Sequence, residues 1–131
     1  MTGLVWWMRV VGGLYLFLFV AATFLRLPIR EEGPKGLLTQ ASAGDPIARF
    51  VVDTWVMLGL YFCVIGTSLL IASLMPVQAQ AVGWTVLGFE VAGIVMDAYK
   101  LKRGYRRRAP VVWLVIHTVI IGTGLYFLGG A

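Results

Sequence analysis

Four stretches of mostly apolar residues, each long enough to cross a lipid bilayer as a helix, dominate this sequence. They run from 4 to 27, 46 to 75, 79 to 101 and 110 to 129. About 20 apolar residues in a helix span the hydrocarbon layer. Because 60% of the 131 residues are hydrophobic, more than in a typical soluble domain, lipid must form part of the solvent. We therefore predict an all-α polytopic membrane protein, a four-transmembrane-helix bundle that is a single domain over 1–131.

Proline and aspartate mark the ends of these predicted helices. Pro28 stops the first span, and Pro76 stops the second because proline cannot continue a helix. Asp45 and Pro46 start the second span, since aspartate caps free backbone amides and proline suits the first helical position. Pro110 opens the fourth span.

The polar connection 28–45 contains two prolines and has room for one short amphipathic turn around Leu37 and Leu38. It is either a solvated surface loop or a lid over a cavity, and the sequence leaves both open. Glycines inside the spans are expected to let helices approach closely; these are Gly12, Gly13, Gly59, Gly66, Gly88 and Gly93.

Basic residues are concentrated at one side of the predicted membrane. Of the eleven Lys and Arg residues, only Arg9 falls on the other side, and the remaining ten flank or fill the first and third connections. The positive-inside rule then places these connections in the cytoplasm and both termini outside, in the inner (plasma) membrane. We interpret the basic run 100–108 as lying against anionic lipid headgroups, and we expect no nucleic-acid partner.

The third stretch carries two carboxylates inside its apolar run. Glu90 and Asp97 are seven residues apart, which returns a helix to nearly the same face. The stripe that they share is Gly83, Leu87, Glu90, Gly93 and Asp97. An ionised carboxylate in hydrocarbon costs on the order of 2.5–3.5 kcal/mol on insertion scales. These groups must therefore face protein or water, or be protonated.

Two more ionisable groups lie at similar depth on other helices. With a rise of about 1.5 Å per residue, Asp97, Asp53, His117 and Glu90 lie about 6, 10, 12 and 16 Å from the cytoplasmic helix ends. We predict that they converge on a polar cavity in the cytoplasmic half of the bilayer. The alternative is that each is satisfied separately. Asp97 would then pair with Lys100 or with an arginine of the loop, Asp53 with Arg49, and His117 would bond to a neighbouring helix.

Acid–base chemistry is the predicted use of these four groups. Histidine exchanges protons near neutral pH, and a carboxyl group kept neutral by burial can donate a proton. We also predict that an apolar ligand is bound by aromatic side chains, for which packing and interface anchoring are the alternative roles; these are Tyr61, Trp55, Trp113 and Tyr99.

No metal or cofactor is predicted. Glu90 and Asp97 are about 10 Å apart along the helix axis, which is too far for both to bind one ion. Cys63 is the single cysteine, so a site with several thiolates is excluded. The sequence contains no phosphate-binding glycine loop, nucleophile elbow or HExxH motif.

Three functions fit this pattern. The first is a membrane enzyme or binder that acts by acid–base chemistry on a lipophilic, isoprenoid-like or lipid-like molecule, for example an isomerase or cyclase. The second is a small proton-coupled transporter or channel subunit. The third is an accessory subunit of a larger membrane complex. Membrane lipids and a lipophilic small molecule are the expected partners, and the sequence leaves a homo-oligomer open.

Overall fold

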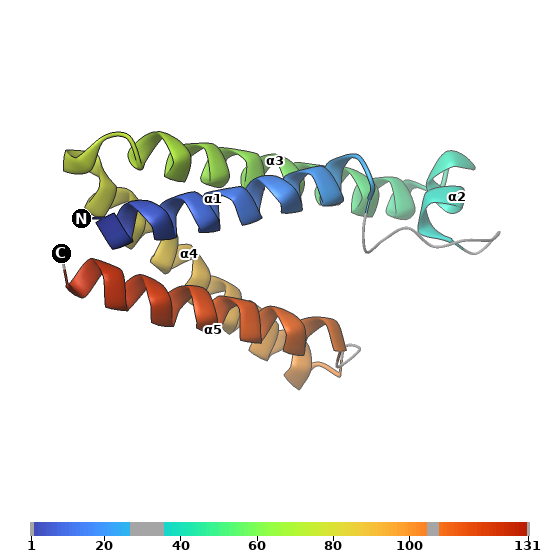
Figure 1. Ribbon diagram of the computed structural model, residues 1–131. Helices are drawn as coiled ribbons and strands as arrows, with labels where there is room; N and C mark the ends of the chain where they lie inside the picture. The colour runs from blue at the N-terminus through green and yellow to red at the C-terminus, as the bar shows by residue number, and fades with distance from the viewer. Residues whose placement is uncertain (1, 27–35, 105–107, 131) are drawn as a thin grey trace. The chain divides into compact units, whose positions relative to one another are not determined.

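A computed structural model describes residues 2–26, 36–104 and 108–130, and within them it contains five helices and no strand. Four of the five helices are long and apolar enough to cross a membrane, which indicates a multi-pass membrane protein. This confirms the predicted all-α class and its four long apolar helices. The helices, labelled in Figure 1, are α1 (Thr2–Thr23), α2 (Leu37–Ser42), α3 (Pro46–Ala72), α4 (Pro76–Lys102) and α5 (Arg108–Gly129).

The long helices differ from the predicted spans by a few residues at their ends. α1 ends at Thr23, earlier than predicted, and the amides of Phe24 and Leu25 both donate to the carbonyl oxygen of Val20. Arg26, just beyond, has a φ of 54°. α4 begins at Pro76 rather than at 79, since a proline that ends one helix can occupy the first position of the next.

The start of α3 has the predicted cap. The backbone amide of Ala48 donates to Asp45 Oδ1 at 2.7 Å. The short helix α2 includes the predicted turn around Leu37 and Leu38. Residues 27–35 of the connection lie outside the described part of the chain, so the idea of a lid stays a prediction.

The described chain divides into two compact units. In the unit 12–67, the later part of α1 and most of α3 pack antiparallel. A Cβ added at Gly66 would lie 2.8 Å from the carbonyl oxygen of Gly12, and one at Gly59 would overlap the side chain of Thr23. The close helix approach predicted at Gly59 and Gly66 is therefore confirmed.

The other unit contains residues 1–11 and 68–131. In it α4 and α5 lie side by side and run antiparallel, as Figure 1 shows. A Cβ at Gly83 would lie 2.8 Å from Leu128, and one at Gly124 would lie 2.6 Å from Leu87. Small residues thus bring these two backbones together, as they do between membrane helices generally.

The beginning of α1 packs against α5 in the same unit, where the buried Trp7 donates from Nε1 to Thr123 Oγ1 at 3.0 Å.

We expect Thr123→Val to lower the free energy of unfolding by about 0.6 kcal/mol, with an upper limit of ~1.7, the range for hydrogen bonds between membrane helices. Unfolding by SDS in mixed micelles would measure it. Thr118→Val is the matched control, because both hydroxyls also donate to the carbonyl oxygen four residues earlier. An equal loss in both variants would contradict a specific contribution from Trp7.

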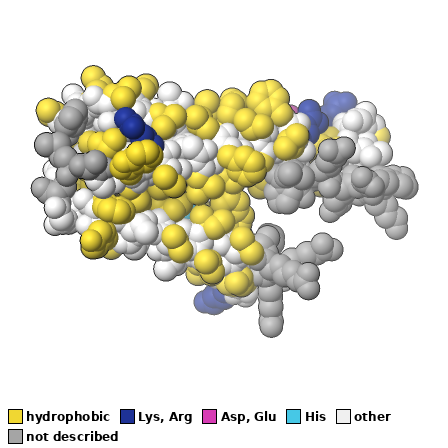
Figure 2. All heavy atoms as spheres, in the orientation of Figure 1, with side chains coloured by type: hydrophobic (Ala, Val, Ile, Leu, Met, Phe, Trp, Pro, Cys, Tyr) yellow, Lys and Arg dark blue, Asp and Glu magenta, His cyan; other side chains and the backbone are white. Residues whose placement is uncertain are grey.

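Large apolar side chains are exposed along all four long helices. Hydrophobic side chains spread over the face shown in Figure 2. Examples on the four helices are Phe17, Phe50, Val95 and Tyr126, each at least 64% exposed. Water would disfavour so much exposed apolar surface, whereas a bilayer accepts it.

Candidate functional site

The predicted polar stripe of α4 faces α5. Glu90 is completely buried at 0% exposure, and Asp97 is 3% exposed. Burying a charge without partners is costly, so the pairing of these two groups decides what the site can be. Both are paired, and the side chain that they share is His117.

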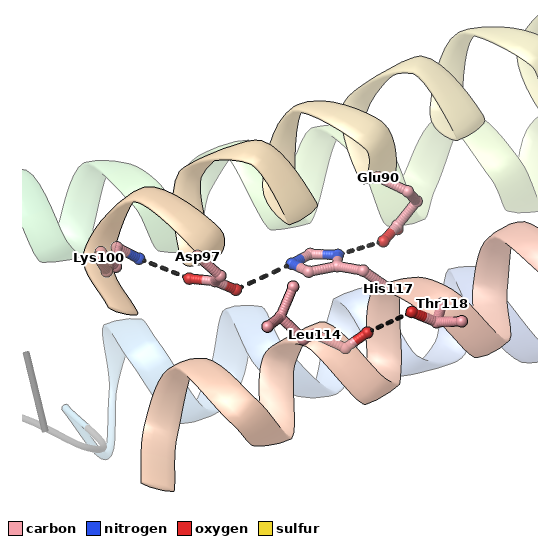
Figure 3. A network of polar contacts seen from close by, with 6 residues as sticks. All are labelled: Glu90, Asp97, Lys100, Leu114, His117 and Thr118. Atoms are coloured by element: carbon pink, nitrogen blue, oxygen red, sulfur yellow. Dashed lines mark hydrogen bonds and ion pairs between the residues drawn. The ribbon is translucent and has the colours of Figure 1, made fainter. Parts of the chain in front are cut away.

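The imidazole of His117 lies between the two carboxylates (Figure 3). Its Nδ1 is 2.5 Å from Glu90 Oε2, a hydrogen bond, and its Nε2 is 3.6 Å from Asp97 Oδ2, an ion-pair distance. The two ring nitrogens point to opposite sides, so one ring bridges two carboxylates a full two turns apart on α4. Glu90 is thus held from the α5 side by a direct bond rather than through water.

Gly93 provides the space for this ring. A Cβ at position 93 would lie 2.5 Å from Cε1 and 2.6 Å from Nε2 of His117, far inside van der Waals contact. Gly93 comes three residues after Glu90 and four before Asp97, so the three share one helix face. The absence of a side chain between the two carboxylates is what allows the imidazole to lie against the backbone of α4.

The cluster continues to the end of α4. Lys100 Nζ donates to Asp97 Oδ1 at 2.9 Å, and its side chain is 43% exposed. The predicted pairing of Asp97 with Lys100 is confirmed, and it occurs together with the contact to His117 (Figure 3). With all four groups ionised, the two positive charges balance the two negative ones.

This arrangement is suited to moving a proton. An imidazole can accept a proton at one nitrogen while it releases another from the opposite nitrogen. In the series Lys100, Asp97, His117, Glu90, a partly exposed lysine lies at one end and a fully buried carboxyl group at the other. The contact from Nε2 to Asp97 is longer than a hydrogen bond, so a small shift of the ring or carboxylate must precede transfer there.

Asp53 belongs to the other compact unit. It is on α3 in the unit 12–67, and its side chain is exposed. In the described part of the chain no ion pair joins it to Arg49, whose Nε donates to the carbonyl oxygen of Ala41 at 3.0 Å. The cluster between α4 and α5 therefore contains three of the four predicted acid–base groups.

The predicted aromatic residues are divided between the two units. Trp113 lies beside the cluster, with its ring centroid 6.0 Å from that of His117. Tyr99 is half exposed on α4, and its hydroxyl accepts a hydrogen bond from Arg103. Trp55 and Tyr61 are on α3 in the other unit. Their role in ligand binding stays a prediction.

Two features of the site were missed from the sequence. Gly93 was expected to allow close approach, but not to seat the histidine ring; its position between Glu90 and Asp97 on one stripe was the available signal. Trp7 and Thr123 form a bond that no sequence spacing indicated, because they are 116 residues apart. In the described residues no group of three or more His, Cys, Asp and Glu side chains is arranged to hold a metal ion.

The sequence matches no family model, no curated protein and no solved structure. The functional interpretation therefore depends on the chemistry of Glu90, His117 and Asp97 themselves.

Proposed function

We propose that this chain performs acid–base chemistry on a lipophilic molecule within the inner membrane, with His117 as the group that exchanges the proton. One observation carries the proposal: a single imidazole bridges two buried carboxylates on an apolar helix. Ionisable groups inside membrane spans are expensive and are usually functional. The charge bias of the loops would place the Lys100 end on the cytoplasmic side.

The roles within the cluster follow from exposure. Glu90 is at 0% exposure, whereas the His117 side chain is 17% exposed, so the imidazole is the group that a molecule in the bilayer would reach. Glu90, bonded to Nδ1, orients the ring and exchanges a proton with it. Nε2 is the nitrogen with the longer contact, and we assign to it the exchange with the ligand.

The packing on the far side of Glu90 supports access from one end of the cluster. Over the next two turns of α4 toward its start, Leu87 and Gly83 contact α5, and Trp7 of α1 closes against Gly124. These contacts are mainly apolar and close. A channel subunit needs a polar route across the whole membrane, which such packing disfavours. An enzyme needs proton exchange with only one side of the membrane, which the cluster allows.

The internal pairing of the charges favours the same function over an accessory subunit. A subunit whose buried charges serve assembly would use them to bind a partner chain. Here His117 pairs with Glu90 and Asp97, and Asp97 pairs with Lys100, all within one unit. We therefore take the enzyme or binder as the proposed function.

Solvent deuterium gives a direct test. In an acid–base isomerisation one carbon of a double bond gains a proton while a neighbouring carbon loses one, so the double bond moves and the atoms balance. The full chain in nanodiscs would be incubated in deuterated water with a total lipid extract. We expect mass spectrometry to find deuterium in a lipophilic species with the wild type, and at least about 100-fold less with His117→Gln, as for loss of an acid–base group.

The control variant is Thr118→Val, the next residue on α5, whose exposed hydroxyl only bonds back to Leu114. It should incorporate deuterium at the wild-type rate. If no lipophilic species gains deuterium, or if the gain is the same with His117→Gln, the proposed function is wrong.

A further inference from the structure

The last turn of α4 and its C-cap residue carry three basic side chains and one tyrosine, namely Lys100, Lys102, Arg103 and Tyr99. Arg103 is three residues from Lys100 and four from Tyr99, and Lys102 is three from Tyr99, the spacing of neighbours on a helix. Lys102 and Arg103 are exposed. Because α4 has the length of a membrane span, this turn falls at the level of the lipid headgroups.

Tyr99 holds Arg103 in a defined position. Arg103 Nε donates to the tyrosine hydroxyl at 2.8 Å, and the guanidinium carbon lies 5.3 Å from the ring centroid. Tyrosine at a membrane interface anchors a helix in this way. Since the bond uses Nε, the two terminal nitrogens of the guanidinium keep their N–H donors for an acceptor beyond the tyrosine.

The positive charge at this end of the helix exceeds the negative charge nearby. Asp97 forms an ion pair with Lys100, and in the described part of the chain neither Lys102 nor Arg103 forms one with a carboxylate. A phosphate group would supply the missing negative charge, and arginine binds phosphate through two parallel N–H bonds.

We propose that Lys100, Lys102 and Arg103 form a binding site for the phosphate headgroup of an anionic phospholipid. The position at the end of a span selects a lipid headgroup over free phosphate. The juxtaposition that carries the proposal is a guanidinium fixed by an interfacial tyrosine next to two lysines on the same turn.

Lys100 belongs to both this site and the buried cluster. A phosphate that draws its ammonium group away would weaken the ion pair with Asp97 and change the surroundings of His117. The coupling would regulate catalysis only if the proposed function is right, so in that respect it rests on the proposed function. Lipid binding and the state of the imidazole are measured separately from activity.

Native mass spectrometry of the full chain would test the binding. Protein in detergent would be offered equal amounts of phosphatidylglycerol and phosphatidylcholine. We expect the wild type to retain the anionic lipid preferentially, and Lys102→Gln with Arg103→Gln to bind it about 25-fold more weakly, since each basic residue near anionic headgroups contributes about fivefold. Arg9→Gln is the control: Arg9 is also exposed and also lies near an aromatic ring, that of Trp6.

The outcomes separate the possible sources of binding. Equal retention of both lipids by the wild type, or the same loss with Arg9→Gln, would overturn the site. Displacement of the lipid by millimolar inorganic phosphate would assign the site to free phosphate and overturn the proposal of a lipid headgroup.

The coupling to the buried cluster is tested separately. The ¹⁵N signals of the single histidine should differ between anionic and neutral nanodiscs in the wild type but not in the double variant, and unchanged signals in the wild type would refute the coupling. A negative deuterium experiment would leave these results as they are.

Discussion

Replacing Gly93 by alanine is expected to expel the His117 ring from its place on α4 and to lower the free energy of unfolding by about 1.5–5 kcal/mol. The new methyl group would stand 2.5 Å from the ring, and overpacking of this kind costs about 1–3 kcal/mol. Loss of the charged hydrogen bond to Glu90 adds about 1.5–3 kcal/mol. The higher helix propensity of alanine offsets about 1 kcal/mol of this loss, so the substitution remains destabilising.

Gly88→Ala is the matched control for this substitution. Gly88 lies on the same helix, and a Cβ there would meet no atom within 4 Å. We expect it to be neutral or to stabilise by up to about 1 kcal/mol through helix propensity alone. Unfolding in SDS micelles measures stability, and the ¹⁵N signals of His117 report the ring. Wild-type signals in Gly93→Ala would show that the ring does not lie against position 93.

The four long helices could be predicted from the sequence because each is set by a local property. Length and hydropathy define a span without any knowledge of its neighbours. Asp45 and Pro46 marked the start of α3 through local capping chemistry, and the bond from Ala48 confirms it. The end of α1 at Thr23 differs from the prediction because apolar residues continue to Leu27, so hydropathy alone does not locate the end of the helix.

The candidate site was predictable only in part, because it depends on the relative rotation of two helices. Glu90 and Asp97 share a face by periodicity alone, so their common orientation followed from the sequence. Whether His117 on α5 turns toward that face depends on how α4 and α5 pack, and packing is set by close contacts such as Gly83 with Leu128. Asp53 is grouped with them by depth alone, which does not fix direction; its side chain is exposed on α3, and its part in the site stays a prediction.

Replacing Glu90 by leucine should have the largest effect on stability, a loss of about 3–5 kcal/mol. Breaking a buried ion pair costs up to about that much, and the His117 that remains keeps only its longer contact to Asp97. His117→Leu should cost a similar amount, because it removes the hydrogen-bond partner that α5 offers to the fully buried Glu90. Asp53→Leu is the control, since this carboxylate is exposed, and its effect should stay within about 0.5 kcal/mol.

The double variant Glu90→Leu with His117→Leu distinguishes a bonded pair from two independent losses. Replacing both members of a buried ion pair with apolar residues is often neutral or stabilising, so the double variant should be more stable than either single variant. SDS unfolding of all four proteins gives the coupling energy, which we expect to exceed about 2 kcal/mol in favour of the pair. If the two single losses simply add, Glu90 and His117 do not act through each other. The buried carboxyl group would then have no route for exchanging protons with α5, and the acid–base function would lose its physical basis.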